Sequence, residues 1–454
     1  MNLPQPLAIL AQATKDSPWS GRLWLVGGAV RDGLLTGDAP TDFDVVLESS
    51  AEDLAAFLWV SGQSEIPPVT YPRFGTALVR IAGANIEFVR ARKESYDLES
   101  RKPNVEPATL LEDAQRRDFT VNALMRNLHT GELTDPLGVG LTDLEKRVLR
   151  TPLEPTATFS DDPLRMLRAV RFRWKLGFDP APGLYEAIRQ ERLRLEIISA
   201  ERIRDEFVKI LSLPTADAAL DDLLDLGLLH IFAPELEAMK GVYQGHYHHL
   251  DVWDHSLLVL KNVGTSDLIL SLAALLHDVG KPQTRIVDAH GHTRFFGHES
   301  VGADIAGQIM DRLKFPHSDI DAVTLLVRHH MRLGSTPEFT KTAARRVLKA
   351  LGDNVDRLVD LCDADSRGLK KGVQTLDIAS IRQVIEQVRI ETPPQALASP
   401  LSGDEIMAIT NLGPGPEIGT LKHFLTEKVL EGELQPMDKA AARKLLESHG
   451  REES

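Results

Sequence analysis

The chain has 454 residues, 43% hydrophobic and 26% charged, which is the composition of an ordinary globular protein with room for several domains. Its single cysteine, Cys362, excludes a disulfide framework, and residues 1–20 lack the basic and apolar regions of a signal peptide. The longest apolar run, residues 268–276, is far shorter than the ~18 residues of a membrane span. We therefore expect a cytoplasmic protein that does not enter a membrane.

The formal net charge of −14 opposes nucleic-acid binding if the charge is spread evenly, because phosphate contacts need basic surface. The charge is not even, since residues 165–175 contain five basic side chains and no acidic one. A polyanion meets local charge rather than the average over the chain. A cationic groove in an acidic protein is therefore compatible with this sequence.

The first 150 residues have the pattern of a small mixed α/β domain. Short runs rich in Val and Ile predict four strands, at residues 22–30, 43–48, 77–83 and 86–91. The first of them runs into a glycine turn, and residues 52–60 are typical of a helix.

After about residue 158 the periodicity is helical, and no clear strand is expected apart from a hairpin around 284–296. Breaks rich in Pro and Gly predict joints near 151–156, 232–245 and 392–403. The predicted fold class is thus α+β, with a small mixed α/β head followed by an all-helical body. We expect four segments: a head at 1–150, a helical neck at 151–240, a third domain at 241–390 and a helical tail at 391–454.

The first candidate site combines a glycine turn with two aspartates. Asp42 and Asp44 alternate on a predicted strand, so both carboxylates point to one face, about 7 Å apart along the chain. Two carboxylates on one face repel each other unless a cation lies between them, and Mg²⁺ prefers carboxylates together with substrate phosphates. Gly27 and Gly28 would let the backbone approach a triphosphate, and Arg31 would add charge-assisted hydrogen bonds.

Several motifs in the first 210 residues together resemble one family. They are GGAVRDGLLTGDAPTDFDVV (27–46), FGTALVRI (74–81), IEFVRARKESY (86–96), RRDFTVNAL (116–124), DDPLRMLRAVRF (161–172) and ERIRDEF (201–207). In this order they resemble the signatures of the class II tRNA nucleotidyltransferases, which include CCA-adding enzymes and bacterial poly(A) polymerases. The resemblance implies a polymerase-β-like head, in which Asp42 and Asp44 hold two Mg²⁺ ions.

The motif RRDFTVNAL resembles the ribose-contacting motif of that family. Arg116 and Arg117 could meet phosphates, Asp118 could accept a hydrogen bond from a ribose hydroxyl, and Asn122 could orient that aspartate. Taken without the neighbouring motifs, the same residues also fit a helix start with Asp118 as its N-cap.

The motif DDPLRMLRAVRF resembles the family's base-recognition helix. Four polar residues recur at intervals of three, which on a helix would place neighbouring members on a shared face. They are Asp162, Arg165, Arg168 and Arg171. The resemblance implies that Asp162 and Arg165 pair with incoming CTP or ATP, and that Arg168 and Arg171 hold the triphosphate or the tRNA end. Residue types alone fit a solvated basic face equally well.

The second candidate site lies in the helical half, where His and Asp occur at spacings that suit a transition metal. The order H…HD…D resembles the HD phosphohydrolase superfamily. This resemblance implies four ligands, His255, His277, Asp278 and Asp365. Lys281 could neutralise a substrate phosphate, and a second metal position could be completed by His298, His329 and His330.

The resemblance spans nearly the whole chain and implies a bacterial CCA-adding type of enzyme. It would transfer CMP, AMP or both from CTP and ATP to the 3′ end of tRNA, with release of pyrophosphate. A poly(A) polymerase and split enzymes that add only CC or only A share the head motifs. From another class of function, the HD half could be the working enzyme, a phosphohydrolase with a nucleotide-sensing head.

Overall fold

The structure is a computed structural model that describes residues 3–37, 42–95, 104–245, 249–264, 267–334, 338–370, 372, 375–393 and 396–452. The chain divides into two compact units, Met1–Phe232 and Ala233–Ser454, and each is described by itself.

The N-terminal unit is built on a seven-stranded mixed sheet with the strand order β3-β4-β5-β2-β1-β8-β9. Strands β2 and β5 are parallel, and the other neighbours are antiparallel. The strands of this sheet are β1 (Trp24–Val26), β2 (Asp42–Leu47), β3 (Val69–Tyr71), β4 (Thr76–Ile81), β5 (Ala84–Arg90), β8 (Met125–Asn127) and β9 (Leu133–Thr134). The central strand β2 ends in three fully buried apolar residues, Val45, Val46 and Leu47, which anchor it in the core.

The remaining strands of this unit form short pairs outside the large sheet. β6 (Arg92–Ser95) pairs with β7 (Asn104–Pro107), and β10 (Val148–Leu149) pairs in parallel with β11 (Asp179–Pro180).

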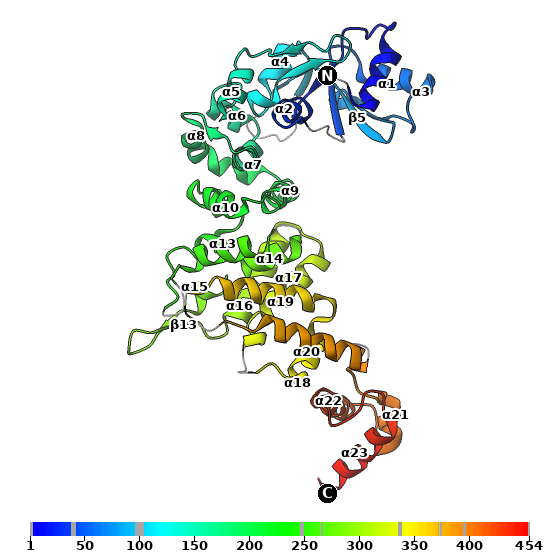
Figure 1. Ribbon diagram of the computed structural model, residues 1–454, viewed down its shortest axis with the longest axis vertical. Helices are drawn as coiled ribbons and strands as arrows, with labels where there is room; N and C mark the ends of the chain where they lie inside the picture. The colour runs from blue at the N-terminus through cyan, green and yellow to red at the C-terminus, as the bar shows by residue number, and fades with distance from the viewer. Residues whose placement is uncertain are drawn as a thin grey trace. The chain divides into compact units, whose positions relative to one another are not determined.

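Helices surround the sheet and then form a helical neck within the same unit (Figure 1). They are α1 (Gln5–Thr14), α2 (Gly28–Leu35), α3 (Ala51–Val60), η1 (Pro72–Phe74), α4 (Leu110–Gln115), η2 (Thr120–Asn122), α5 (Gly140–Lys146), α6 (Pro155–Asp161), α7 (Leu164–Leu176), α8 (Leu184–Glu191), η3 (Arg192–Ile197), α9 (Ala200–Leu211), α10 (Ala216–Asp225) and α11 (Leu229–Phe232). Local sequence sets several of their ends. The side chains of Ser50 and Thr109 accept hydrogen bonds from the first turns of α3 and α4, and Gly177 ends α7 in the left-handed conformation.

The C-terminal unit is helical in its described residues apart from the hairpin β12 (Ile286–Val287) and β13 (Thr293–Arg294) and a single bridge between Tyr243 and Asp251. Its helices stack in Figure 1 from α13, in green, to α23, in red. They are α12 (Pro234–Glu237), α13 (Val252–Val263), α14 (Leu268–Leu276), α15 (Lys281–Thr284), α16 (His298–Arg312), α17 (His317–His329), η4 (Arg332–Gly334), α18 (Lys341–Leu351), η5 (Gly352–Asn354), α19 (Val355–Arg367), α20 (Ile378–Glu391), α21 (Gly403–Thr410), α22 (Pro416–Glu431) and α23 (Lys439–Glu452).

The predicted fold class, a small mixed α/β head followed by helices, is confirmed, and the hairpin near 284–296 is present. Two details are wrong. The first strand covers only Trp24–Val26, because the backbone turns at Gly27 into a helix that starts at Gly28. A short strand also recurs after residue 158, since Asp179–Pro180 pairs with the end of the head. Within the described ranges no helix has the length and apolarity to cross a membrane.

Candidate functional site

The glycine turn of the head lies directly against one of the two aspartates. Gly27 has φ +71° and ψ −142°, a combination that residues with a side chain rarely adopt. A Cβ atom added to Gly27 would lie 3.5 Å from Oδ2 of Asp44. The turn between β1 and α2 therefore passes beside the carboxylate with no side chain in between.

Asp42 and Asp44 project from the open face of β2, as predicted, because Phe43 between them is buried on the other face. A third carboxylate, Glu87 on β5, lies opposite Asp44 in the parallel register. Neighbouring protein displaces water and raises the pKa of Asp44, the charge of Arg117 opposes this, and the charge of Asp42 adds to it. The pKa of Glu87 is raised by desolvation and by Asp44, with Arg92 opposing.

These three carboxylates lie on the neighbouring strands β2 and β5 and offer hard oxygens, the donors that a divalent cation such as Mg²⁺ prefers. Burial is the main cause of the two raised pKa values, repulsion between the carboxylates adds to it, and a cation between them would remove that repulsion. The sequence interpretation missed Glu87. Its signal was present in the strand IEFVRA (86–91), where a charged residue alternates with buried Ile86 and Phe88.

A chain of polar contacts leads from the glycine turn toward α7. Arg31 on α2 is only 2% exposed, and its guanidinium donates to Asp32 at 2.7 Å and to the side-chain oxygen of Asn122. Asn122 in turn donates to Oδ1 of Asp118 at 2.9 Å, the orientation that the sequence predicts. Arg168 on α7 donates to Oδ2 of Asp118 from Nε and Nη2, at 3.0 and 2.5 Å.

These polar contacts keep the carboxyl group of Asp118 ionised. Burial alone would raise its pKa, but the charge of Arg168 and the hydrogen bonds from Asn122 and Arg168 lower it to about 2. The alternative that Asp118 is the N-cap of a helix is wrong, because the N-cap of the short helix η2 is Phe119.

Glu206 on α9 is a second carboxylate that the sequence interpretation missed. Its side chain is 3% exposed and accepts from Nε of Arg171 at 2.6 Å, and Nη1 of Arg168 lies at 3.5 Å. Burial would raise the pKa of Glu206, but Arg171 and Arg168 outweigh it and lower the pKa. Two of the predicted nucleotide-binding arginines are thus fixed to a helix of the neck.

The base-recognition motif differs from its expected geometry at one end. Helix α7 begins at Leu164, so Asp162 lies before it in an extended conformation and does not share a helical face with the arginines. Pro163 causes this, because a residue before proline is disfavoured in the α region. Asp162 accepts from Arg202 of α9 at 3.1 Å. Arg165 does lie on α7, where its guanidinium donates to the backbone carbonyls of Thr158 and Arg116 at 3.3 and 2.5 Å.

Arg116 and Arg117 were expected to meet phosphates. In the structure both donate to the buried carboxylate of Asp113, at 2.6 and 2.9 Å. Burial would raise the pKa of Asp113, but the two arginines outweigh it and lower the pKa. Their guanidiniums are therefore held at the end of α4, with the charge of Arg117 reaching Asp44.

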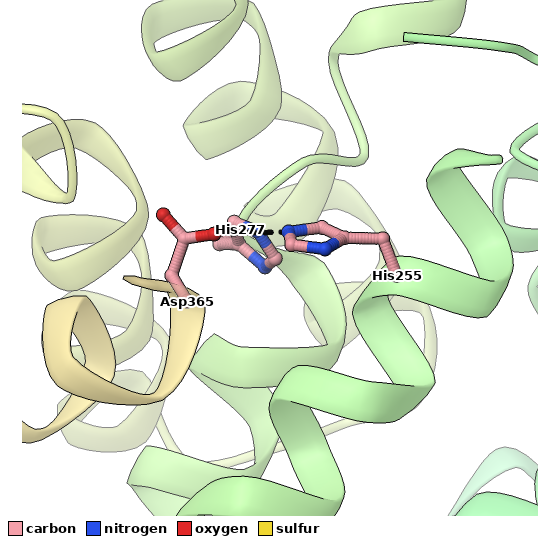
Figure 2. Close-up of side chains that lie close together, drawn as sticks. All are labelled: His255, His277 and Asp365. Carbon is pink, nitrogen blue, oxygen red and sulfur yellow. Dashed lines mark hydrogen bonds and ion pairs between the residues drawn. The ribbon is translucent and has the colours of Figure 1, made fainter. Parts of the chain in front are cut away.

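The C-terminal unit brings the histidines and aspartates of the second site together. His255 on α13, His277 after α14 and Asp365 on α19 point toward one another (Figure 2). Nε2 of His255 lies 2.9 Å from Oδ1 of Asp365, and Nε2 of His277 lies 4.0 Å from the same oxygen. Burial would lower the pKa of His277, but the charges of Asp278 and Asp365 raise it. The same negative charge would attract a metal cation.

A second group of three possible ligands lies beside the first and contains Asp278, whose Oδ2 lies 3.1 Å from Nε2 of His277. Its other members are His298 at the start of α16 and His330 directly after α17. The Nδ1 atoms of these two histidines contact the carbonyls of Phe295 and Val327 at 2.8 and 2.7 Å, so Nδ1 carries the hydrogen. Their Nε2 atoms face each other at 3.2 Å, and Oδ1 of Asp278 lies 3.4 Å from Nε2 of His298.

The chemistry of this second group fits a metal. Burial and neighbouring His277 lower the pKa of His330 to about 4, and burial lowers the pKa of His298, so both are neutral near pH 7. Two neutral histidines with lone pairs facing each other cannot hydrogen bond, whereas a cation satisfies both. Within the described residues, the buried atoms Nε2 of His277 and Oδ1 of Asp278 also have no hydrogen-bond partner. Asp278 has Oδ2 at 3.1 Å from Nε2 of His277 and Oδ1 at 3.4 Å from Nε2 of His298, so its carboxylate faces both groups.

Two expectations about this site change. His329 does not belong to either group, because it lies outside the cluster on the preceding position of α17, half-buried beside Arg328 and Arg332. Lys281 contacts Asp278 at 2.6 Å and Gln244 at 2.5 Å, so it neutralises a ligand carboxylate in this structure. Of the histidine-rich stretch 246–255, residues 246–248 lie outside the described ranges.

Three family models match the chain. They are the poly A polymerase head domain at residues 23–150, the probable RNA and SrmB-binding site of polymerase A at 177–240, and the HD domain at 245–368.

Curated relatives match over most of the chain. An A-adding tRNA nucleotidyltransferase of Deinococcus radiodurans is 35% identical over 92% of this chain and 94% of its own length. A CC-adding tRNA nucleotidyltransferase of Thermus thermophilus is 35% identical over 94% of each chain. Among solved structures, a CCA-adding enzyme of Bacillus stearothermophilus in complex with CTP has a TM-score of 0.71 at 23% identity, covering 100% of this chain and 99% of its own. At 23% identity, the similarity to this solved structure supports the fold alone.

Proposed function

Because the chain belongs to the tRNA nucleotidyltransferase and poly(A) polymerase family and contains an HD domain, we propose that it adds CMP, AMP or both from CTP and ATP to the 3′ end of tRNA. The observation that carries this proposal is the placement of Asp42 and Asp44 on one face of β2, with Glu87 opposite Asp44 on β5, beside a glycine turn whose backbone has no side chain in the way. This is the arrangement that phosphoryl transfer needs, because catalysis there is positioning and charge stabilisation.

Each group of residues has a role in this proposal. The three carboxylates hold Mg²⁺, which when bound supplies positive charge to the triphosphate and to the attacking 3′ oxygen. The backbone at Gly27 and Gly28 accommodates the phosphates, and Asp118, oriented by Asn122, accepts from the ribose. Pyrophosphate is the leaving group, since the α-phosphate forms the new bond to the 3′ oxygen and its bond to the β-phosphate breaks.

Base selection is assigned to Asp162 and Arg165, with one condition. The carboxylate of Asp162 accepts a hydrogen bond from Arg202 at 3.1 Å. Arg165 donates to two backbone carbonyls, and the other N–H donors of its guanidinium are left for a base edge. Asp162 would therefore exchange Arg202 for the base when a nucleotide binds. The relatives include one A-adding and one CC-adding enzyme at equal identity, so both CTP and ATP are candidate substrates.

The test is nucleotide incorporation on three tRNA transcripts, ending before CC, after CC and after CCA, each with CTP, ATP or both. A stop at CCA identifies a complete CCA-adding enzyme, a stop after CC or action only on the CC-ended transcript identifies a split enzyme, and a long A tail identifies a poly(A) polymerase. Asp42→Asn and Glu87→Gln should lower incorporation at least 100-fold, the order expected when an electrostatic group of a catalytic site is lost. Asp53→Asn on the exposed face of α3 is the matched control, and no incorporation by the wild type refutes the proposal.

A second function is favoured by the two ligand groups of the C-terminal unit. We propose that these two groups, His255, His277 and Asp365 in one and Asp278, His298 and His330 in the other, would hold divalent transition-metal ions in a phosphohydrolase site. A cavity of about 570 Å³ opens over this site, and its lining includes Asp278, Lys281, Arg294, Phe296, His298, His330 and Asp365. The test is release of nitrophenol from p-nitrophenyl phosphate and its bis ester after loading with Mn²⁺, Ni²⁺ or Fe²⁺. Asp278→Asn should abolish release and His329→Ala should not, whereas equal rates for the two variants would refute the site.

A further inference from the structure

We propose that Phe172 is a positioning residue for nucleotide binding in the head, because its aromatic ring lies within cation–π distance of Arg31, Arg168 and Arg171, the three arginines that the sequence assigns to the triphosphate. This inference rests on the proposed nucleotidyltransferase function. It concerns a side chain that is not among the residues assigned above to the nucleotide.

The ring of Phe172 has an unusual set of neighbours. The guanidinium carbons of Arg31, Arg168 and Arg171 lie 5.1, 5.4 and 4.4 Å from the ring centroid, all within the ~6 Å over which a cation is attracted to the ring. Arg31 comes from α2, directly after the glycine turn, and the other two come from α7. Since a ring has two faces, at least two of the three cations share a face.

Three positive charges around one ring repel one another, so each needs a fixed partner of its own. Arg31 has Asp32 and Asn122, Arg168 has Asp118, and Arg171 has Glu206. These partners lie on α2, in the segment 118–122 and on α9, and none of them contacts all three arginines, although Glu206 also lies 3.5 Å from Nη1 of Arg168. The ring of Phe172 is what the three cations share, and its negative π face offsets part of their repulsion.

The ring itself is fixed in place. Phe172 is 6% exposed, and it packs edge to face against fully buried Phe119 with centroids 5.5 Å apart and planes at 71°. Phe119 is the neighbour of Asp118, which holds Arg168. The ring therefore has one orientation, set by the core of the head, and transmits it to the guanidiniums.

The contact also preserves the chemistry that a nucleotide needs. An arginine held through a π face uses none of its five N–H donors for that contact, whereas an arginine held by another carboxylate would use two of them. Phe172 thus orients Arg31, Arg168 and Arg171 while leaving donor capacity for phosphate oxygens. A leucine would fill similar space but would offer no negative face to the cations.

The experiment separates the charge of the ring from its volume. In the full-length protein, Phe172 is replaced by 4-fluoro-, 3,5-difluoro- and 3,4,5-trifluorophenylalanine, which keep the shape and weaken the π face step by step. The same series at Phe207 is the matched control, because Phe207 is 2% exposed and packs edge to face on Phe232 at 5.6 Å. Binding of CTP and ATP is measured by calorimetry with Ca²⁺, and KM and kcat are measured by incorporation with Mg²⁺.

We expect the Kd and KM for the nucleotide to rise with each fluorine, to about tenfold in the trifluoro protein, the size of a partly buried cation–π contact. The value of kcat should change less than about twofold, and Phe172→Leu should resemble the trifluoro protein while Phe172→Tyr stays near the wild type. A Kd that ignores fluorine number, or that responds equally at Phe207, overturns the inference and leaves a packing role. Nucleotide incorporation by the wild type decides the proposed function separately, and a wild type that binds no nucleotide overturns both.

Discussion

Replacement of Asp118 by asparagine tests how much the polar chain of the head contributes to folding. The carboxylate is 8% exposed and accepts from Arg168, from Asn122 and from the backbone N–H of Phe119. A pKa lowered from 3.8 to about 2 corresponds to about 2.5 kcal/mol of stability at neutral pH. We therefore expect Asp118→Asn to lower the free energy of unfolding of the N-terminal unit by about 2–3 kcal/mol, since the amide also leaves Arg168 without its carboxylate.

The pH dependence gives this prediction its sign. A carboxylate with a lowered pKa contributes fully above its unfolded pKa of 3.8, and the contribution is lost as the pH falls through about 2. The difference between the wild type and the variant should therefore be constant from pH 5 to pH 8 and should shrink only below about pH 4.

Urea unfolding followed by tryptophan fluorescence measures this difference, because four of the five tryptophans lie in the N-terminal unit. Asp53→Asn is the control, since its side chain is exposed on α3. A difference under 1 kcal/mol at pH 7 would refute the reasoning, because it would mean that the folded protein does not lower the pKa of Asp118. A difference that fades between pH 7 and pH 5 would also refute it, because it would mean that the pKa of Asp118 is raised.

Three further predictions concern the C-terminal unit. His330→Ala should reduce the metal measured by mass spectrometry from two ions per chain to one, whereas His329→Ala should keep both. Removal of metal with a chelator should lower the melting temperature of this unit and leave that of the N-terminal unit unchanged, because ions that bind only the folded state stabilise it. Gly280→Ala should destabilise the unit by about 3 kcal/mol, since the new Cβ would lie 2.3 Å from the carbonyl oxygen of His298. Gly307→Ala is the control, because its Cβ would make one contact at 3.4 Å, and it should have little effect in the same melting experiment.

Much of the head site follows from the sequence because it depends on local geometry. The alternation of Asp42 and Asp44 is a property of any strand, and Gly27 indicates a backbone conformation that other residues avoid. Glu87 and Glu206 were missed because their roles come from neighbours far along the chain. The pairing of β5 with β2 places Glu87 beside Asp44, and the packing of α9 on α7 places Glu206 beside Arg171.

Two of the wrong details could have been avoided with the same local reasoning. Pro163 follows Asp162, and proline restrains the residue before it from a helical conformation, so Asp162 had to precede the helix of Arg165. His330 falls in the buried stripe that includes Val323 and Val327 at helical spacing, and His329 does not. The assignment of ligands to two metal groups was different, since it requires five elements to meet and no spacing in the sequence encodes that meeting.

The arginines of the head show why this site suits a strongly charged ligand in a protein of net charge −14. Arg117, Arg165, Arg168 and Arg171 all have partners in the structure, so their side-chain entropy is already lost before a nucleotide arrives. Binding a flexible lysine or arginine would cost roughly 0.5–1.5 kcal/mol for each side chain that becomes ordered, and a fixed set avoids that cost. Acidic residues such as Asp118 and Glu206 therefore do not make the positive charge of these arginines useless for binding. They hold its cations in place, so in the proposed reaction an acidic chain would offer already ordered cations to the triphosphate.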